Sequence, residues 1–230
     1  MIQRIFRQAM VVVGKDLLLE WRGKSRIISV LLFGLTTLLL FSFAIGPNTQ
    51  MLQRVAPGFL TLALLLSSTL ALSESFRLER EERAIEGLLL IPVDPTALYY
   101  GKAVSNFVLL LVMGPVLVPV ALVLYSASID GPSLVKLGLL WALASGGLAA
   151  PGTMYAAMTS RLRGQDVLLP LLLFPLVVPV LVATTKGISL LMYGDPMEQF
   201  NSWMILLLMF NLVYWPLCGP LFPFLMDDGG

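Results

Sequence analysis

The stretch "IISVLLFGLTTLLLFSFAIG", residues 27–46, contains twenty residues and no charged side chain. In an α-helix, which rises about 1.5 Å per residue, a run of this length crosses the hydrocarbon core of a bilayer, about 30 Å thick. A barrel strand would alternate polar and apolar residues, and this run does not. Since lipid offers no hydrogen-bond partners to the backbone, the stretch predicts a transmembrane helix.

Five further apolar runs follow along the chain, at about 55–73, 103–125, 134–157, 167–188 and 203–225. Turn-forming sequences separate some of them, namely "GPN" at 46–48, "DGPS" at 130–133 and "YGDP" at 193–196. The chain is 57% hydrophobic and only 13% charged, too little charge for the surface of a soluble domain. We therefore predict an all-α integral membrane protein with six transmembrane helices.

Composition also excludes several classes of function. The net charge is +1, so nothing indicates a nucleic-acid partner. The lone Cys218 excludes an internal disulfide, and its apolar surroundings favour a buried structural thiol. The chain contains no histidine, which removes the commonest metal ligand and the usual general base at neutral pH. We predict neither a metal site nor a catalytic site.

Basic residues are distributed unequally between the two sides of the predicted spans. Twelve lie on one side: Arg4, Arg7, Lys15, Arg22, Lys24, Arg26, Arg77, Arg80, Arg83, Lys102, Arg161 and Arg163. Three lie on the other side: Arg54, Lys136 and Lys186. This bias predicts that both termini lie in the cytoplasm.

Residues 1–25 precede the first span and do not have the pattern of a signal peptide. Apolar residues recur at helical spacing along this segment: Ile2, Ile5, Phe6, Ala9, Met10, Val13 and Leu17. The spacing predicts an amphipathic helix on the cytoplasmic membrane surface, with Trp21 and Arg22 as interfacial anchors. The alternative is a cytoplasmic extension of the first span.

The longest predicted cytoplasmic connection contains "ESFRLEREERAIEGLLLIPVDP", residues 74–95, with eight charges in its first thirteen residues. Opposite charges pair at i,i+4, as in Arg77 with Glu81. Pro92 ends the predicted helix, and Asp94-Pro95 is typical of an N-cap and first turn of the next one. We predict an amphipathic helix over 76–91.

This helix is either a solvated connection or a docking surface for a soluble partner. Apolar residues rimmed by charge favour docking. The candidate interface comprises Phe76, Arg77, Glu79, Arg80, Glu81, Glu82, Arg83, Glu86, Leu88 and Leu89.

Four motifs give the chain a resemblance to a known family. They are "KDLLLEWRGKSR" at 15–26, "FRLEREERAIEGLLLIPV" from Phe76, "GLAAPG" at 147–152 and "SRLRGQDVLLPLLLFPLVVPVLV" at 160–182. In their order and spacing they resemble the haem exporter protein B family (CcmB), the membrane subunit of the ABC transporter for cytochrome c maturation. The resemblance covers nearly the whole chain, and the sixth span contributes least to it.

The resemblance implies an exporter-type ABC permease forming a single domain over 1–230 in the bacterial inner membrane. It implies a cytosolic ATPase partner, further membrane subunits that handle haem, and haem as the handled ligand. Residues 76–91 would then be the coupling helix seated on the ATPase. A second copy of the chain is a further candidate partner, because six spans are few to enclose a large path.

The residues themselves contain no site for ATP or haem that we can name. Gly23-Lys24-Ser25 matches only the tail of a P-loop, so ATP is expected on the partner chain. No Asp or Glu lies inside the six predicted spans. Residues that could ligate haem iron or face its propionates have ordinary structural explanations: Met154, Tyr155, Met158, Cys218, Lys186 and Arg54.

Prolines interrupt the third, fourth, fifth and sixth predicted spans, and they predict either static kinks or hinges. Small residues at 146–152 predict close helix contact, within one subunit or between two. Two other functions share this layout. One is a permease for another exported substrate, such as a glycan, lipid or drug, and the other is a membrane scaffold without a transport path.

Overall fold

The computed structural model describes residues 2–81, 94–160 and 165–227. These residues form seven helices and no strand: α1 (Ile2–Gly23), α2 (Ser25–Ile45), α3 (Thr49–Glu81), α5 (Pro95–Leu124), α6 (Gly131–Ser160), α7 (Gln165–Tyr193) and α8 (Phe200–Asp227). Six of them are long and apolar enough to cross a membrane, and α1 is the exception. The all-α membrane fold predicted from hydropathy is confirmed.

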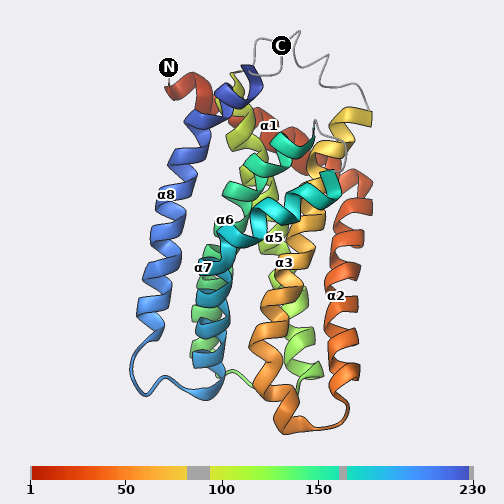
Figure 1. Cartoon of the computed structure of the whole chain (residues 1–230), viewed down its shortest axis with the longest axis vertical. Coiled ribbons are helices and arrows are strands. Elements are labelled where there is room, and N and C mark those ends of the chain that lie inside the picture. The colour runs from red at the N-terminus through yellow and green to blue at the C-terminus, as the bar shows by residue number, and fades with distance from the viewer. Residues whose placement is uncertain (1, 82–93, 161–164, 228–230) are drawn as a thin grey trace.

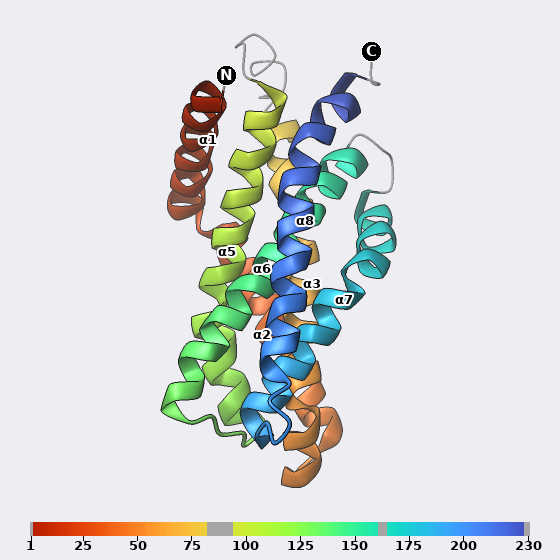
Figure 2. The ribbon, with the colours of Figure 1, turned by 90° about the vertical axis from the view of Figure 1, so that its left-hand side faces the viewer.

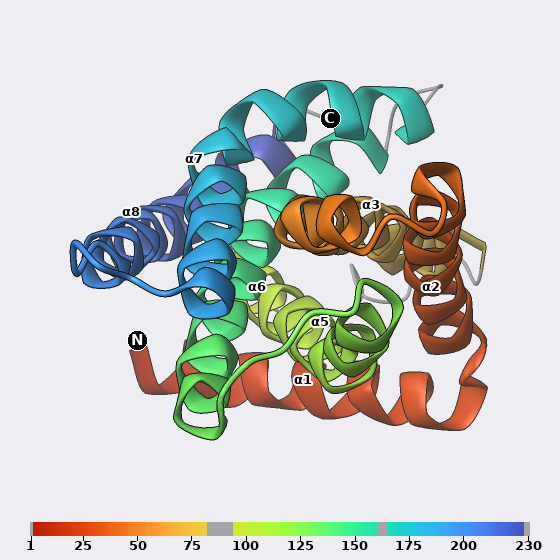
Figure 3. The ribbon, with the colours of Figure 1, turned by 90° about the horizontal axis from the view of Figure 1, so that it is seen from below.

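The six long helices run along the long axis of the molecule, as Figure 1 shows. The connections from α2 to α3, from α5 to α6 and from α7 to α8 lie at one end. Helix α1, the start of α5 and the end of α8 lie at the other, which we call the α1 end. Seen along the bundle, α2 and α8 occupy opposite flanks, and α1 extends along the side of α5 (Figure 3).

Helices α3 and α5 extend further than hydropathy predicted. Helix α3 continues to Glu81, and α5 begins at Pro95 rather than near residue 103. The Asp94 side chain accepts a hydrogen bond from the Thr96 amide at 2.9 Å, and Pro95 occupies the first helical position. The predicted N-cap is therefore confirmed, and it holds the first turn of α5 beyond the apolar run.

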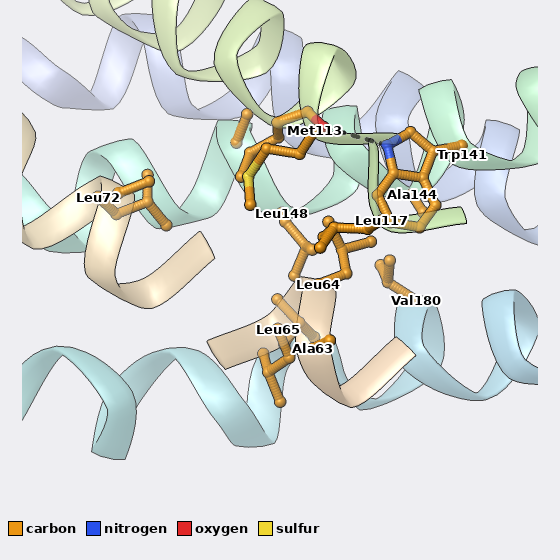
Figure 4. Packing of buried hydrophobic residues seen from close by; sticks show 14 of the residues in the cluster. Ala63, Leu64, Leu65, Leu72, Met113, Leu117, Trp141, Ala144, Leu148 and Val180 are labelled. Atoms are coloured by element: carbon orange, nitrogen blue, oxygen red, sulfur yellow. Dashed lines mark hydrogen bonds between the residues drawn. The ribbon is translucent and has the colours of Figure 1, made fainter. Parts of the chain in front are cut away.

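The core lies where α3, α5, α6 and α7 meet (Figure 4). Trp141 packs there beside Met113 and Leu117, and its indole N–H donates to the Leu110 carbonyl at 3.1 Å. This bond gives the indole N–H an acceptor, which neither lipid nor an apolar core could provide. The aromatic ring also fixes how closely α5 and α6 approach each other.

The small residues of α6 permit close packing within the subunit. A Cβ atom at Gly147 would lie 3.0 Å from Val180 of α7, and one at Gly152 would lie 2.4 Å from Leu72 of α3. At Gly146 it would lie 2.5 Å from Asn211 of α8. The stretch 146–152 thus brings three neighbouring helices against α6, as the intrasubunit alternative required.

Helix α7 contains Pro170, Pro175 and Pro179 and is bent. Its first part slants across the bundle near α3, and its second part runs along the bundle axis (Figures 1 and 2). A proline removes one backbone hydrogen bond and its ring clashes with the preceding turn, which accounts for a bend in this run.

Helix α1 packs along α5 and is separated from α2 by Lys24, whose φ of 49° is left-handed. Val12 lies so close to Gly101 that a Cβ atom there would be 2.5 Å from the Val12 Cβ. Phe6 and Trp21 point away from the bundle, 67% and 76% exposed. Helix α1 is thus a distinct element with one face on the bundle and an apolar edge exposed, as expected of an interfacial helix.

Candidate functional site

The predicted docking segment lies only partly within the described residues. Phe76 is in α3, and α3 continues through Glu81, so the backbone there is helical as predicted. Five residues of the candidate interface lie outside the described residues: Glu82, Arg83, Glu86, Leu88 and Leu89. Between Phe76 and the start of the undescribed part, only the backbone of Arg77, Glu79, Arg80 and Glu81 is described.

The first residue of the segment and the first described residue after it are both anchored in the bundle. At the α3 end, Phe76 is 4% exposed, and the Lys102 ammonium lies 5.0 Å from the centre of its ring. Lys102 of α5 also donates to the Ser75 carbonyl at 3.3 Å. At the α5 end, the Asp94 amide donates to the Gln8 side chain of α1 at 3.3 Å. The described residues on the two sides of the undescribed part are therefore held by contacts with α5 and α1.

A cluster of polar side chains adjoins these residues, with Lys102 as a member of it. It comprises Asp16 and Glu20 of α1, Arg26 of α2, Lys102 and Asn106 of α5, and Thr153 of α6. We call these six residues the polar cluster.

Lys102 joins α1 to α5 within this cluster. Its ammonium lies 3.4 Å from an Asp16 carboxylate oxygen, and the two side chains are 3% and 11% exposed. Asp16 also contacts the more exposed Lys15 at 3.2 Å. A lysine so deeply buried requires a carboxylate partner, because an unpaired charge there is costly.

Arg26 makes the most connections. One terminal nitrogen contacts the Glu20 carboxylate, and the two side chains are 9% and 8% exposed. The other terminal nitrogen donates to the Ala71 carbonyl at 2.6 Å and to the Asn106 carboxamide oxygen at 2.7 Å. Asn106 in turn donates to the Thr153 hydroxyl at 3.0 Å. One guanidinium thus contacts α1, α3 and α5 and reaches α6 through Asn106.

Glu20 illustrates the balance of forces in this cluster. Burial raises the pKa of its carboxyl above the ordinary value, and Asp16 adds to that, whereas Arg26 and Lys102 lower it. Burial has the largest effect of these. The ionised carboxylate is therefore held by its cationic partners against the cost of desolvation, so its position depends on theirs.

The contacts of the cluster connect helices to one another. Within the described ranges, no group of three or more His, Cys, Asp or Glu could hold a metal ion. Apart from the Lys15–Asp16 pair within α1, each polar contact of the cluster joins two different helices. The cluster can fix how α1, α2, α3, α5 and α6 lie relative to one another at the base of the docking segment.

Sequence reasoning did not find this cluster. It counted Arg26 and Lys102 as charges that orient the chain, and it included Arg26 in the motif at 15–26 without assigning it a partner. It did not single out Asn106 or Thr153. One signal was available, since a carboxamide within the apolar run 103–125 requires a hydrogen-bond partner. The sequence did not predict which residue that partner is, because Thr153 lies 47 residues further along the chain.

Two apolar grooves lie on the side of the bundle. One, of about 350 Å³, lies between α5, α6 and α8 and includes Phe107, Leu143, Asn211 and Trp215 in its lining. The other, of about 340 Å³, lies between α5 and α6 and includes Pro115, Pro119 and Trp141. Neither lining contains Met, Cys, Tyr or His, the side chains that could ligate haem iron.

The residues considered as haem ligands lie outside the linings of these two grooves. Cys218 is buried in the core beside Tyr99, which agrees with a structural thiol. Met154 and Tyr155 pack against the core, and Met158 is 37% exposed. The structure brings none of these residues to either groove.

Comparison with known proteins decides the family. The family model for the CcmB protein matches residues 7–220. The chain belongs to the CcmB family. The resemblance seen in its motifs is therefore confirmed.

Several CcmB-family relatives are similar over most of their length. "Heme exporter protein B" of Haemophilus influenzae is 34% identical over 173 residues, covering 74% of this chain and 76% of the relative. The proteins of the same name from Shigella flexneri and Escherichia coli are 32% and 31% identical over 204 residues, covering 87% of both chains. The residues matched by the family model, 7–220, include all six residues of the polar cluster.

Proposed function

We propose that this chain is the permease subunit of an ATP-driven ABC complex for haem export or delivery in the biogenesis of c-type cytochromes. The observation that carries the proposal is the CcmB family match over residues 7–220, together with relatives named as haem exporters. The six apolar helices support a role inside the membrane. The subunit itself is not an enzyme, and ATP is hydrolysed by a partner ATPase chain.

In this proposal the ATPase binds residues 76–91 from the cytoplasm. The dense charge of the segment supports this role, and so do the contacts that hold Phe76 before the undescribed part and Asp94 after it. A rigid base transmits a displacement of the segment to the bundle, whereas a loose connection would absorb it. Further membrane subunits handle haem at the outer face.

The test of the proposal is purification of the intact complex from its native membrane. We expect a cytosolic ATPase, at least one further membrane subunit and bound haem to co-purify with this chain. A complex that carries a glycan, lipid or drug in place of haem would indicate a permease for another export substrate. A complex whose ATPase activity is unaffected by substitutions in residues 76–91 would indicate a membrane scaffold without a transport path.

The proposed location is the bacterial inner membrane, with both termini in the cytoplasm. The unequal distribution of basic residues supports this orientation. So does the structure, because α1 and the end of α8 lie at the same end of the bundle as the base of segment 76–91.

Cysteine labelling tests the topology in a Cys218→Ala background. We expect an impermeant reagent added from outside to label Asn48→Cys and Asp195→Cys, which lie in the connections at the end opposite α1. The same reagent should label Glu82→Cys only after the membrane is permeabilised. External labelling of Glu82→Cys in intact cells would contradict the proposed orientation.

Haem binding by the isolated subunit provides a second test. Because the chain has no histidine, we expect the purified subunit to show no bis-histidine haem spectrum at stoichiometric loading. Haem that co-purifies should instead be retained by other members of the complex. Tight haem binding that Met154→Ala or Met158→Ala abolishes would require a haem site in α6.

A further inference from the structure

We infer that Arg26 is a positioning residue that makes α1 a moving part of the coupling device rather than a static membrane anchor. This role rests on the proposed ATP-driven function. It specifies a route, meaning a chain of contacts through which movement passes from one helix to the next. The route runs from the last turns of α3, through Arg26, to α1 on one side and to α6 on the other.

The first step of the route is the contact with α3. Arg26 donates to the Ala71 carbonyl at 2.6 Å, five residues before Phe76 at the base of segment 76–91. A displacement of α3 at this point moves the Ala71 carbonyl, to which the guanidinium is hydrogen-bonded. The Arg26 side chain is 9% exposed, so water does not compete effectively for these hydrogen bonds.

The second step divides the movement between two helices. The guanidinium is a rigid planar fork, so a shift of one nitrogen is accompanied by a shift of the other. One terminal nitrogen contacts Glu20 of α1, and the other contacts Asn106 of α5 at 2.7 Å. Helix α1 therefore follows α3, instead of sliding along the bundle surface.

The third step ends at the proline of α6. Asn106 donates to Thr153 at 3.0 Å, and the Tyr99 hydroxyl donates to the Ala150 carbonyl at 3.0 Å. These two bonds from α5 flank Pro151, which cannot donate a backbone hydrogen bond within α6. The route thus reaches α6 at the point where that helix has lost one of its own hydrogen bonds.

The orientation of α1 supports a mechanical role for it. Its carboxylates Asp16 and Glu20 point into the bundle, whereas the aromatic residues Phe6 and Trp21 point away. Membrane anchoring requires only the outward apolar edge. The inward carboxylates have partners on two different helices, Arg26 of α2 and Lys102 of α5, which fix α1 to both.

Two conservative substitutions test the route at its two ends. Arg26→Lys keeps the positive charge beside Glu20 but loses the fork, because a lysine has a single nitrogen. Thr153→Val removes only the hydroxyl at the α6 end. Each has a matched control. Arg22→Lys changes an exposed arginine, and Thr159→Val removes a buried hydroxyl that bonds only within α6.

Three quantities are measured for each variant: membrane abundance with co-purified ATPase, the rate of ATP hydrolysis, and haem-stained c-type cytochrome. For Arg26→Lys and Thr153→Val we expect the ATPase to remain bound and active. We expect the cytochrome yield to fall roughly tenfold, within the range by which residues along a coupled network alter coupling. The ATP hydrolysed per cytochrome matured therefore rises, and a purely structural defect would not raise it. Both controls should behave as the unaltered chain.

Three results would overturn the inference. One is a normal cytochrome yield in Thr153→Val. This result would exclude the route even if Arg26→Lys lowers the amount of the protein in the membrane. Another is a parallel fall of bound ATPase and cytochrome in both variants, which would show a role in assembly alone. The third is an equal effect in Thr159→Val. If the unaltered chain instead fails to co-purify an ATPase, the proposed function fails, and the route fails with it for that separate reason.

Discussion

A Leu88→Asp variant is expected to reach the membrane at near-normal abundance and to lose its ATPase partner. If 76–91 is the coupling helix, Leu88 belongs to the apolar face that seats it on the ATPase. A carboxylate there is desolvated without a partner, which is the most costly change a docked face can suffer. If residues 76–91 are instead a solvated connection, the Leu88→Asp substitution should have almost no effect on ATPase binding.

Charge reversal in the same segment is expected to act in the same direction, but less severely. Removing one partner of a desolvated interfacial ion pair costs roughly 2–5 kcal/mol, or at least about a 30-fold loss of affinity. An exposed ion pair is worth at most about 1 kcal/mol. Arg80→Glu and Arg83→Glu should therefore release the ATPase, or leave it bound with ATP hydrolysis uncoupled from cytochrome maturation.

Co-purification of the ATPase and haem-stained cytochrome are the two measurements for these variants. Arg54→Glu is a matched control, since it reverses an exposed arginine on the opposite side of the predicted spans. If Leu88→Asp, Arg80→Glu and Arg83→Glu all keep both the ATPase and normal cytochrome, residues 76–91 are only a solvated connection.

Lys102→Met is expected to have the largest effect on stability. The substitution leaves Asp16 facing the bundle without its buried partner, and it removes the ammonium from the Phe76 ring and the Ser75 carbonyl. Breaking one side of a buried ion pair costs about 3–5 kcal/mol. For a chain of this size we expect the Tm of the detergent-solubilised protein to fall by on the order of 10 °C.

Lys136→Met provides the control for this prediction. Lys136 also lies over an aromatic ring, 5.7 Å from the centre of Phe200, but it is exposed. Its loss should leave the Tm nearly unchanged. The double variant Asp16→Leu/Lys102→Met should recover much of the lost stability, because both members of the buried Asp16–Lys102 pair are then removed together. An unchanged Tm in Lys102→Met would show that Asp16 is well solvated without it.

The fold was largely predictable from hydropathy, because lipid imposes a minimum length and composition on each span. The helix ends were less predictable. Helix α3 continues through the polar residues up to Glu81, and α5 begins eight residues before its apolar run. Hydropathy marks where lipid ends, whereas the start of α5 is stabilised by Asp94 as a cap and by packing against α1.

The candidate site was predictable only where its signal is local. The charge density of 76–91 and the Asp94-Pro95 cap are visible in adjacent residues. The contacts of Arg26 with Ala71 and Asn106 join positions 45 and 80 residues apart, and no local pattern reports such a pairing. Lys102 was counted for topology because an exposed and a buried lysine look alike in sequence.

The separation of the Arg26 partners along the chain also sets an order of events during synthesis. Glu20 emerges just before Arg26, but Asn106 follows 80 residues later and Thr153 a further 47. At translation speeds of about 5–20 residues per second, α2 waits on the order of 4 to 16 s for Asn106. During that interval Glu20 is the only one of these partners present to neutralise Arg26. Glu20 is therefore the first of these partners available to Arg26, well before α5 completes the network.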